Sequence, residues 1–273
     1  MERFGSLLIV AAMRAGYAAR GVVYLTVGVL ALAASAGGGP APGLVGAVRR
    51  LGDLPWHKPI LFALALGLAL YAVWRGVDAI VDLAGHESRV GRGFGWVERV
   101  GLFVGALLHL VFASYALRLG LGGEYAPGGG ARLAGLVAAL IGHPLGRSFV
   151  VLVGVGTVAF GAYSVWMAAS SRYRAHLRHS ALLERAIPLL AFGLVARGVV
   201  FTVMGGFIVR AGWNFEPMAA GGFGDALERI RGVDYGRALI GLVGAGLIAF
   251  ALYCFVEACY RVIPERRDAS SGR

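Results

Sequence analysis

The sequence predicts an all-α membrane protein in which six transmembrane helices form three tandem helical hairpins. Hydrophobic residues make up 58% of the chain and charged residues only 15%, whereas a soluble domain carries about 25% charged residues. Several apolar runs reach roughly 18–24 residues, the length needed to cross a hydrocarbon core. These runs also recur as three related copies. The short alternating segments of a β-barrel are not found in the sequence.

The second helix of each copy carries the clearest repeat. Segments that begin at Ala47, Leu136 and Ala226 align without gaps at offsets of 89 and 179 residues. The matched sets are Lys58, Arg147 and Arg237; Gly67, Gly156 and Gly246; and Tyr71, Phe160 and Phe250. Self-similarity at a fixed period is typical of repeat architectures. It predicts three units of about 89 residues, with a pseudo-threefold arrangement.

The first helix of each copy repeats at offsets of 85 and 177 residues. The matched sets are Arg20, Gly105 and Arg197; Tyr24, His109 and Phe201; and Gly16, Gly101 and Gly193. The glycine and small-residue frame therefore recurs more faithfully than the charges do. Glycines in transmembrane helices let neighbouring backbones approach closely, so we expect this frame to be a packing face.

Taken in order, the predicted spans are 15–36, 59–80, 100–118, 148–168, 187–209 and 238–260. Within each unit, an excursion separates the two spans and contains a helix too short to cross the membrane. These short helices are predicted at Leu44–Leu51, Arg132–Ile141 and Asp225–Arg231, the first two after glycine-rich breaks. One membrane domain thus holds units at about 13–84, 97–173 and 187–262, and a cytoplasmic tail follows at 263–273.

The basic residues indicate orientation and partners. The net charge is +11, and all basic residues except Lys58 are arginines. They lie mostly at helix ends, which is typical of a membrane protein and not of a nucleic-acid surface. The termini and the loops on their side carry 13 basic residues, and the excursions carry 10. This bias predicts a multi-pass plasma-membrane protein with both termini in the cytoplasm. The expected partner is the bilayer, including anionic lipid headgroups, and the oligomeric state is left open.

Arg20 and Arg197 are the main candidate functional residues, together with Tyr24 and His109. Both arginines fall inside predicted spans, where a charge costs at least about 2.5–3.5 kcal/mol. One interpretation is an anion or lipid-phosphate site. The other is a structural arginine that extends to the interface or binds a neighbouring helix. His109 is a mid-span histidine that either carries protons or forms an interhelical hydrogen bond.

Asp78 and Glu257 occupy equivalent positions near the ends of their spans. Each carboxylate has an arginine nearby, Arg75 for Asp78 and Arg261 for Glu257. The second pair has the favourable i,i+4 spacing. Local ion pairs are the simpler interpretation. A polar network that also includes Arg20 and Arg197 is the alternative.

The sequence contains no catalytic or cofactor-binding motif and no Cys/His cluster with metal-ligand spacing. We therefore expect a non-enzymatic bundle without cofactor or metal, which binds a lipid or a protein partner. The alternative is a transporter or channel for a small solute or ion. In that case, Arg20, Arg197, His109 and the carboxylates would line one water-filled cavity.

The opening motif R-x-G-Y-x-x-R-G-x-V-Y at Arg14–Tyr24, with the G-x3-[YF] pattern of the second helix, resembles the DUF1206 family of bacterial integral membrane proteins. The resemblance extends over about residues 10–262. It implies three tandem two-helix units and a membrane location, but no established activity. Copy two departs from the motif because Gly105 stands where the other copies have arginine.

Overall fold

The computed structural model describes residues 2–37, 39–81, 92–123, 129–143, 145–170, 173–174 and 181–261. The predicted tail at 263–273 and much of the loop at 172–185 lie outside these residues. The described chain is helical, and six helices are long and apolar enough to span a membrane. They are α1 (Glu2–Ser35), α3 (His57–Val81), α5 (Arg92–Gly120), α7 (Gly146–Ala169), α8 (Ala181–Asn214) and α10 (Gly236–Tyr260). The predicted fold class and the six spans are confirmed.

The three short helices also form, as α2 (Leu44–Gly52), α6 (Gly129–Ile141) and α9 (Phe223–Arg231). A 3₁₀ turn, η2 (Pro217–Ala219), precedes α9. Helix α6 begins at Gly129, three residues before its predicted start at Arg132 and inside the glycine-rich break. Glycine lowers helix propensity but does not prevent a helix from forming. The long helices extend past the predicted spans, since a helix does not have to end where the hydrocarbon core ends.

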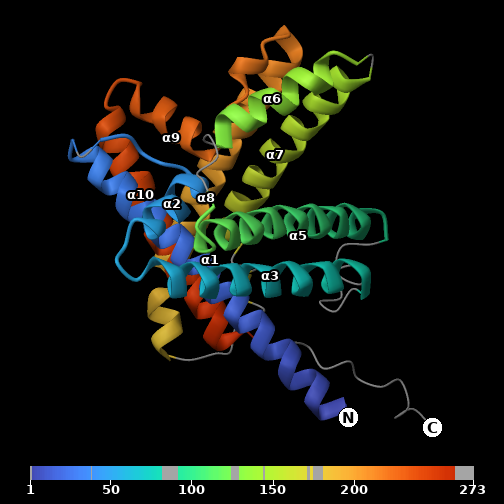
Figure 1. Ribbon diagram of the computed structural model, residues 1–273, viewed down its shortest axis with the longest axis vertical. Helices are drawn as coiled ribbons and strands as arrows, with labels where there is room; N and C mark the ends of the chain where they lie inside the picture. The colour runs from blue at the N-terminus through green and yellow to red at the C-terminus, as the bar shows by residue number, and fades with distance from the viewer. Residues whose placement is uncertain are drawn as a thin grey trace.

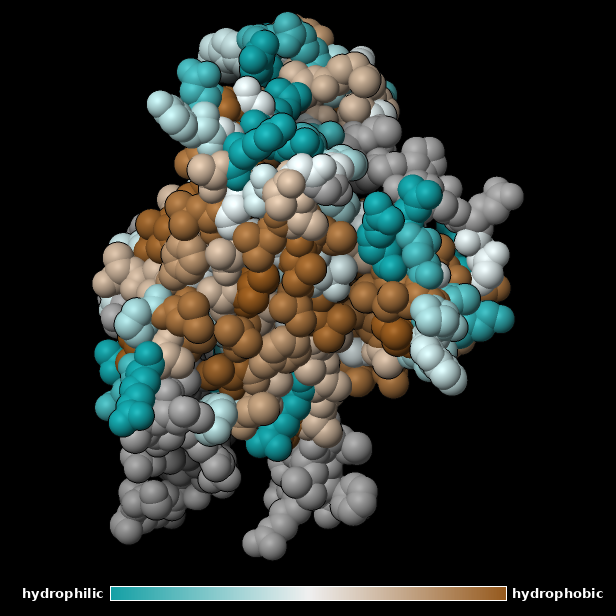
Figure 2. Space-filling model, turned by 90° about the vertical axis from the view of Figure 1, so that its left-hand side faces the viewer, coloured by the Kyte–Doolittle hydropathy of each residue, from teal (hydrophilic) through white to brown (hydrophobic). Residues whose placement is uncertain are grey.

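Large apolar side chains are exposed along the long helices. Figure 2 shows a broad hydrophobic band across the middle of one face, with polar side chains gathered beyond it at the top and sides. A helix satisfies its own backbone hydrogen bonds, so it is a stable way to cross such an apolar layer. The band and the six apolar helices identify a multi-pass membrane protein.

The long helices pack as three antiparallel pairs that link consecutive units. The closely packed pairs are α3 with α5, α7 with α8, and α10 with α1 (Figure 1). Each pair joins the second helix of one unit to the first helix of the next, and the third unit returns to the first. The pairs therefore link the three units in a cyclic order. The pseudo-threefold arrangement of the units stays a prediction. The closest packing of the long helices thus lies between units and not within a hairpin.

Glycines set the spacing of these pairs. A Cβ atom added at Gly28 of α1 would lie 2.8 Å from the carbonyl oxygen of Gly244 on α10. Likewise, a Cβ atom at Gly205 of α8 would lie 2.8 Å from the carbonyl oxygen of Gly154 on α7. Both pairs therefore have backbone against backbone, as small residues allow in membrane helices.

Packing within units differs among the three copies. Helices α1 and α3 pack together in unit 1, and α8 and α10 pack together in unit 3. Among the described residues of unit 2, α5 and α7 do not form a packed pair, and Figure 1 shows them diverging. The helical ring therefore runs from α5 through α3, α1, α10 and α8 to α7, and it is open between α5 and α7.

The short helices of units 1 and 3 connect those units on one side of the membrane. The backbone nitrogen of Ala41 donates a hydrogen bond to the carboxylate of Glu228 on α9. Arg231 donates to the carbonyl oxygen of Gly39 at 3.1 Å. The backbones of Gly43 and Gly224 also meet there, before α2 and at the start of α9. These contacts hold the α1–α10 side of the ring closed.

We predict that Gly205→Val destabilises the bundle by about 1–3 kcal/mol, because the added side chain overpacks the contact with α7. Gly206→Val is the matched control, since a Cβ atom there meets nothing within 4 Å. Thermal unfolding of the detergent-solubilised protein measures both changes. Equal midpoints for the two variants would show that the α7–α8 contact does not depend on glycine.

Candidate functional site

The six aromatic positions of the repeat form three ring pairs, which we call the aromatic layer. The ring of Phe250 lies 4.8 Å from that of Tyr24, measured between centroids. The corresponding distances are 4.5 Å for Tyr71 and His109 and 5.0 Å for Phe160 and Phe201. Each pair joins the second helix of one unit to the first helix of the next. The aromatic layer thus has the same cyclic order as the helices.

Arg20 of α1 lies in this layer and is 7% exposed. Its Nη1 donates a hydrogen bond to the hydroxyl of Tyr71 at 2.8 Å. Its Cζ lies 4.9 Å from the ring centre of Phe250 and 5.7 Å from that of Tyr24. In the described structure its Nε is buried and makes no hydrogen bond. Arg20 therefore touches hydroxyl and aromatic groups from three helices.

Arg197 of α8 is the equivalent residue of unit 3 and is 5% exposed. Its Nη2 donates to the hydroxyl of Ser164 on α7 at 2.7 Å. Its Cζ lies 4.6 Å from the ring centre of Phe250 and 4.9 Å from that of Phe160. Phe250 thus contacts both guanidinium groups, which places the two charges within roughly 10 Å of each other.

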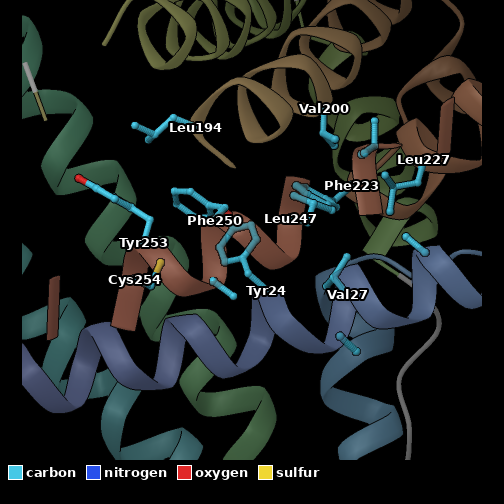
Figure 3. Close-up of a cluster of buried hydrophobic side chains, with 14 of the residues drawn as sticks. Tyr24, Val27, Leu194, Val200, Phe223, Leu227, Leu247, Phe250, Tyr253 and Cys254 are labelled. Atoms are coloured by element: carbon cyan, nitrogen blue, oxygen red, sulfur yellow. The ribbon is translucent and has the colours of Figure 1, made fainter. Parts of the chain in front are cut away.

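Figure 3 shows the setting of Phe250 on α10. Its ring lies beside that of Tyr24 and nearly perpendicular to it, while Leu194 and Val200 come from α8 above it in this view. Tyr24 and Phe250 are both buried, and they belong to an apolar core cluster that extends to Leu247 and Phe223. The two arginines therefore border the main hydrophobic core of the protein.

Glu257 is the candidate carboxylate with a described partner. Glu257 accepts a hydrogen bond from Arg261 at 2.5 Å, which is the i,i+4 pair expected from the sequence. Asp78 is fully buried on α3. Among the salt bridges of the described residues, none joins a carboxylate to Arg20 or Arg197. The two charges are stabilised instead by hydroxyl groups and aromatic faces.

Tyr71 connects the layer to a further arginine. Its hydroxyl accepts hydrogen bonds from Arg20 and from Nε of Arg75, the latter at 2.9 Å. Phenylalanine occupies the equivalent positions in the other two units. Only unit 1 therefore has a hydroxyl at this repeat position, and that hydroxyl accepts hydrogen bonds from two arginines.

His109 packs against Tyr71 and lies in the same layer. Its Nδ1 is 2.6 Å from the carbonyl oxygen of Gly105, one turn earlier on α5. Because a carbonyl only accepts, this Nδ1 carries the proton and donates it. The described residues contain no group of three His, Cys, Asp or Glu side chains that could hold a metal ion.

Gly105 is the point where unit 2 departs from the other units. It occupies the place of Arg20 and Arg197, and a Cβ atom there would meet nothing within 4 Å. The layer therefore holds two arginines from this repeat position, and no such side chain connects α5 to α7.

A separate apolar groove of about 450 Å³ lies on unit 3, between α8, α9 and α10. Val199, Val203, Leu242 and Arg229 are among its lining residues. The guanidinium of Arg229 is 3.9 Å from the ring centre of Phe207. This groove is separate from the aromatic layer and its two arginines, because none of those residues lines the groove.

Sequence reasoning selected Arg20, Arg197, Tyr24 and His109, and the structure brings these four residues into one layer. It did not select Ser164, Phe250 or the hydroxyl of Tyr71. The recurrence of Tyr71, Phe160 and Phe250 at one repeat position was a usable signal for Phe250 and Tyr71. Ser164 gave no signal, because a serine inside an apolar span usually bonds its own helix, as Ser164 also does through Phe160.

Comparison with known proteins gives a family and no activity. The family model described as Domain of Unknown Function (DUF1206) matches residues 15–82, 100–171 and 192–261. The chain is 27% identical over 267 residues to an uncharacterized protein, YxxB, of Bacillus subtilis (strain 168). That alignment covers 96% of this chain and 91% of the relative. No solved structure matches the chain significantly.

We predict that Tyr71→Phe lowers the free energy of unfolding by about 1.5–3 kcal/mol, the usual contribution of a hydrogen bond to a charged group. The ring shape is kept, so the loss reports the hydroxyl that Arg20 and Arg75 share. Tyr235→Phe is the control, because Tyr235 is 89% exposed. Denaturant titration of the purified protein measures the difference, and matching midpoints for the two variants would refute the role of the hydroxyl.

Proposed function

The chain belongs to the DUF1206 family, and we propose that it is a non-enzymatic plasma-membrane protein that binds an anionic group at Arg20 and Arg197. The bound group is a phosphate or carboxylate, carried by a membrane lipid. The observation that carries the proposal is the pair of buried guanidinium groups around Phe250, which form no salt bridge within the described residues.

Charge balance supports this proposal. Aromatic faces stabilise a desolvated cation by about 2 kcal/mol, and each arginine has one described hydroxyl acceptor. Neither contact neutralises the charge, and two cations close together in an apolar interior also repel each other. An anion between them would remove the repulsion and accept hydrogen bonds from both. Planar guanidinium groups suit phosphate and carboxylate oxygens particularly well.

The open side of the ring supports a lipid as the carrier of this anion. The ring of helices is open between α5 and α7. On these two helices the aromatic layer is formed by His109 and Phe160, respectively. Phe160 is 42% exposed and contacts Arg197. A headgroup could therefore approach from the side while its chains stay among apolar side chains of the exposed helices.

A transporter for small anions is the alternative, because paired guanidinium groups also suit a free anion. In that case, the two arginines would bind the anion transiently on its way across the membrane. Efflux of labelled phosphate from sealed vesicles distinguishes the two functions. A receptor leaves the efflux rate at the level of protein-free vesicles, and a transporter raises it.

We predict that the double variant Arg20→Gln/Arg197→Gln retains at least about tenfold less acidic lipid than the unmodified protein, because two charge-assisted contacts are lost. Arg210→Gln is the control, since Arg210 is exposed and pairs with Glu216 at 3.7 Å. Native mass spectrometry after reconstitution with phosphatidylglycerol counts the bound lipid.

Two further measurements complete this experiment: one tests whether a free anion binds, and the other controls for misfolding of the glutamine variant. Phosphatidylcholine vesicles with inorganic phosphate in the buffer test whether a free anion suffices, and phosphate-dependent thermal stabilisation would show that it does. Arg20→Lys/Arg197→Lys keeps both charges and should retain more lipid than the glutamine variant. Unchanged lipid retention in a folded glutamine variant would overturn the proposed site.

We also predict that both termini lie in the cytoplasm. A reporter that is active only in the cytoplasm should be active when fused after Arg273. The same reporter inserted between Leu54 and Pro55, beyond α2, should be inactive, because the excursions carry fewer basic residues. The reverse pattern of activity would place the termini on the opposite side.

A further inference from the structure

Units 1 and 3 close their two helices around a glycine at the same repeat position. A Cβ atom added at Gly16 of α1 would lie 2.6 Å from Cβ of Tyr71 on α3. A Cβ atom added at Gly193 of α8 would lie 2.6 Å from the carbonyl carbon of Ala249 on α10 and would also meet Phe250. In both units, the glycine of the first helix therefore receives the backbone of the second helix at its aromatic position.

A second glycine makes the reciprocal contact. A Cβ atom at Gly67 of α3 would lie 2.5 Å from Cβ of Ala19 and 3.1 Å from the carbonyl oxygen of Ala15. The equivalent Gly246 of α10 would meet Ala196 and Phe192, which are the matches of Ala19 and Ala15. Each closed hairpin therefore contains two close contacts, one centred on each helix.

Unit 2 has both glycines and neither contact. Gly101 of α5 matches Gly16 and Gly193, and Gly156 of α7 matches Gly67 and Gly246. A Cβ atom at either one would meet nothing within 4 Å. Their expected partners by repeat position are Phe160 for Gly101, and Val100 and Val104 for Gly156. These three side chains are 42%, 56% and 49% exposed.

The exposure of the two helices agrees with this comparison. In their most apolar 18-residue windows, α5 is 17% buried and α7 is 22% buried, whereas the other four spans are at least 39% buried. Glycine in a helix interior lowers helix stability, and close packing of a neighbouring helix compensates for it. In the open arrangement, Gly101 and Gly156 have no neighbour that compensates for them.

We infer that the bundle has a second, closed arrangement in which α5 packs against α7 within the same chain. Gly101 then receives Phe160, and Gly156 receives Val100 and Val104, as the equivalent residues do in units 1 and 3. The ring of six helices becomes continuous, and the aromatic layer is covered on its open side. The inference rests on the repeat comparison alone and does not depend on the proposed ligand.

The residue at the arginine position explains why unit 2 is the unit that opens. In unit 1, Arg20 bonds Tyr71 across the hairpin, and in unit 3, Arg197 stacks on Phe250 across the hairpin. Unit 2 has Gly105 there, so opening breaks no such contact. In lipid, the burial of apolar surface contributes little to the association of two helices. The loss of one polar contact therefore strongly affects the equilibrium between a packed and an open hairpin. The pairs α3–α5 and α7–α8 remain packed as α5 approaches α7.

Cysteine cross-linking in native membranes tests the closed arrangement. The pair is Gly101→Cys with Phe160→Cys, in a chain whose Cys254 and Cys259 are replaced by alanine and serine. Oxidation should link these two thiols within one chain, which removes free thiols without a band at twice the mass. Phe103→Cys with Phe160→Cys is the control, because Phe103 lies on a different face of α5 and should remain unlinked. A link that forms only between two chains, or no link at all, overturns the inference.

A distance measurement keeps the inference testable if the glycine variant folds poorly. Spin labels attached to Leu110→Cys and Val153→Cys, at exposed positions of α5 and α7, should give two distance populations in vesicles. The shorter population corresponds to the closed arrangement. A single long distance under all lipid compositions tested would contradict the closed state.

Discussion

The architecture depends on placing two guanidinium groups where water is scarce. Arg20 and Arg197 both contact the ring of Phe250, so the helices α1, α8 and α10 must meet at one level. A charge in such a place is stable only when several groups converge on it. Ser164 and Tyr71 complete that convergence from α7 and α3. Five of the six long helices therefore contribute a side chain to the environment of these two arginines. Helix α5 is connected to them through the contact of His109 with Tyr71.

Glycine contacts make this convergence possible. Backbones that touch at Gly28 and Gly244, and again at Gly205 and Gly154, bring helix axes close enough for short polar contacts across them. Wider spacing would leave the arginine side chains among apolar neighbours without acceptors. Close packing and charge stabilisation are thus coupled.

Much of the fold could be predicted from the sequence, because hydropathy and repeat spacing report directly on spans and equivalent residues. The partner of each helix could not. An alignment shows that Gly16, Gly101 and Gly193 are equivalent, but not that Gly101 lacks a neighbour. The same limit applies to the site: Arg20 and Arg197 are unusual in an apolar run, whereas Phe250 and Ser164 acquire their role only through spatial proximity. Glu257 follows local spacing, and its described partner is Arg261, four residues later at the end of α10.

The glycine at position 105 also bears on how three similar units can share one centre. Two like charges repel through a single interaction, whereas three charges around an axis repel through three. A threefold repetition of an arginine-bearing unit would therefore be limited by its own electrostatics. Replacement of the arginine in one copy removes two of the three repulsive interactions, at the cost of symmetry. An internally repeated membrane protein with a charged axis is thus expected to diverge first at the residue closest to that axis.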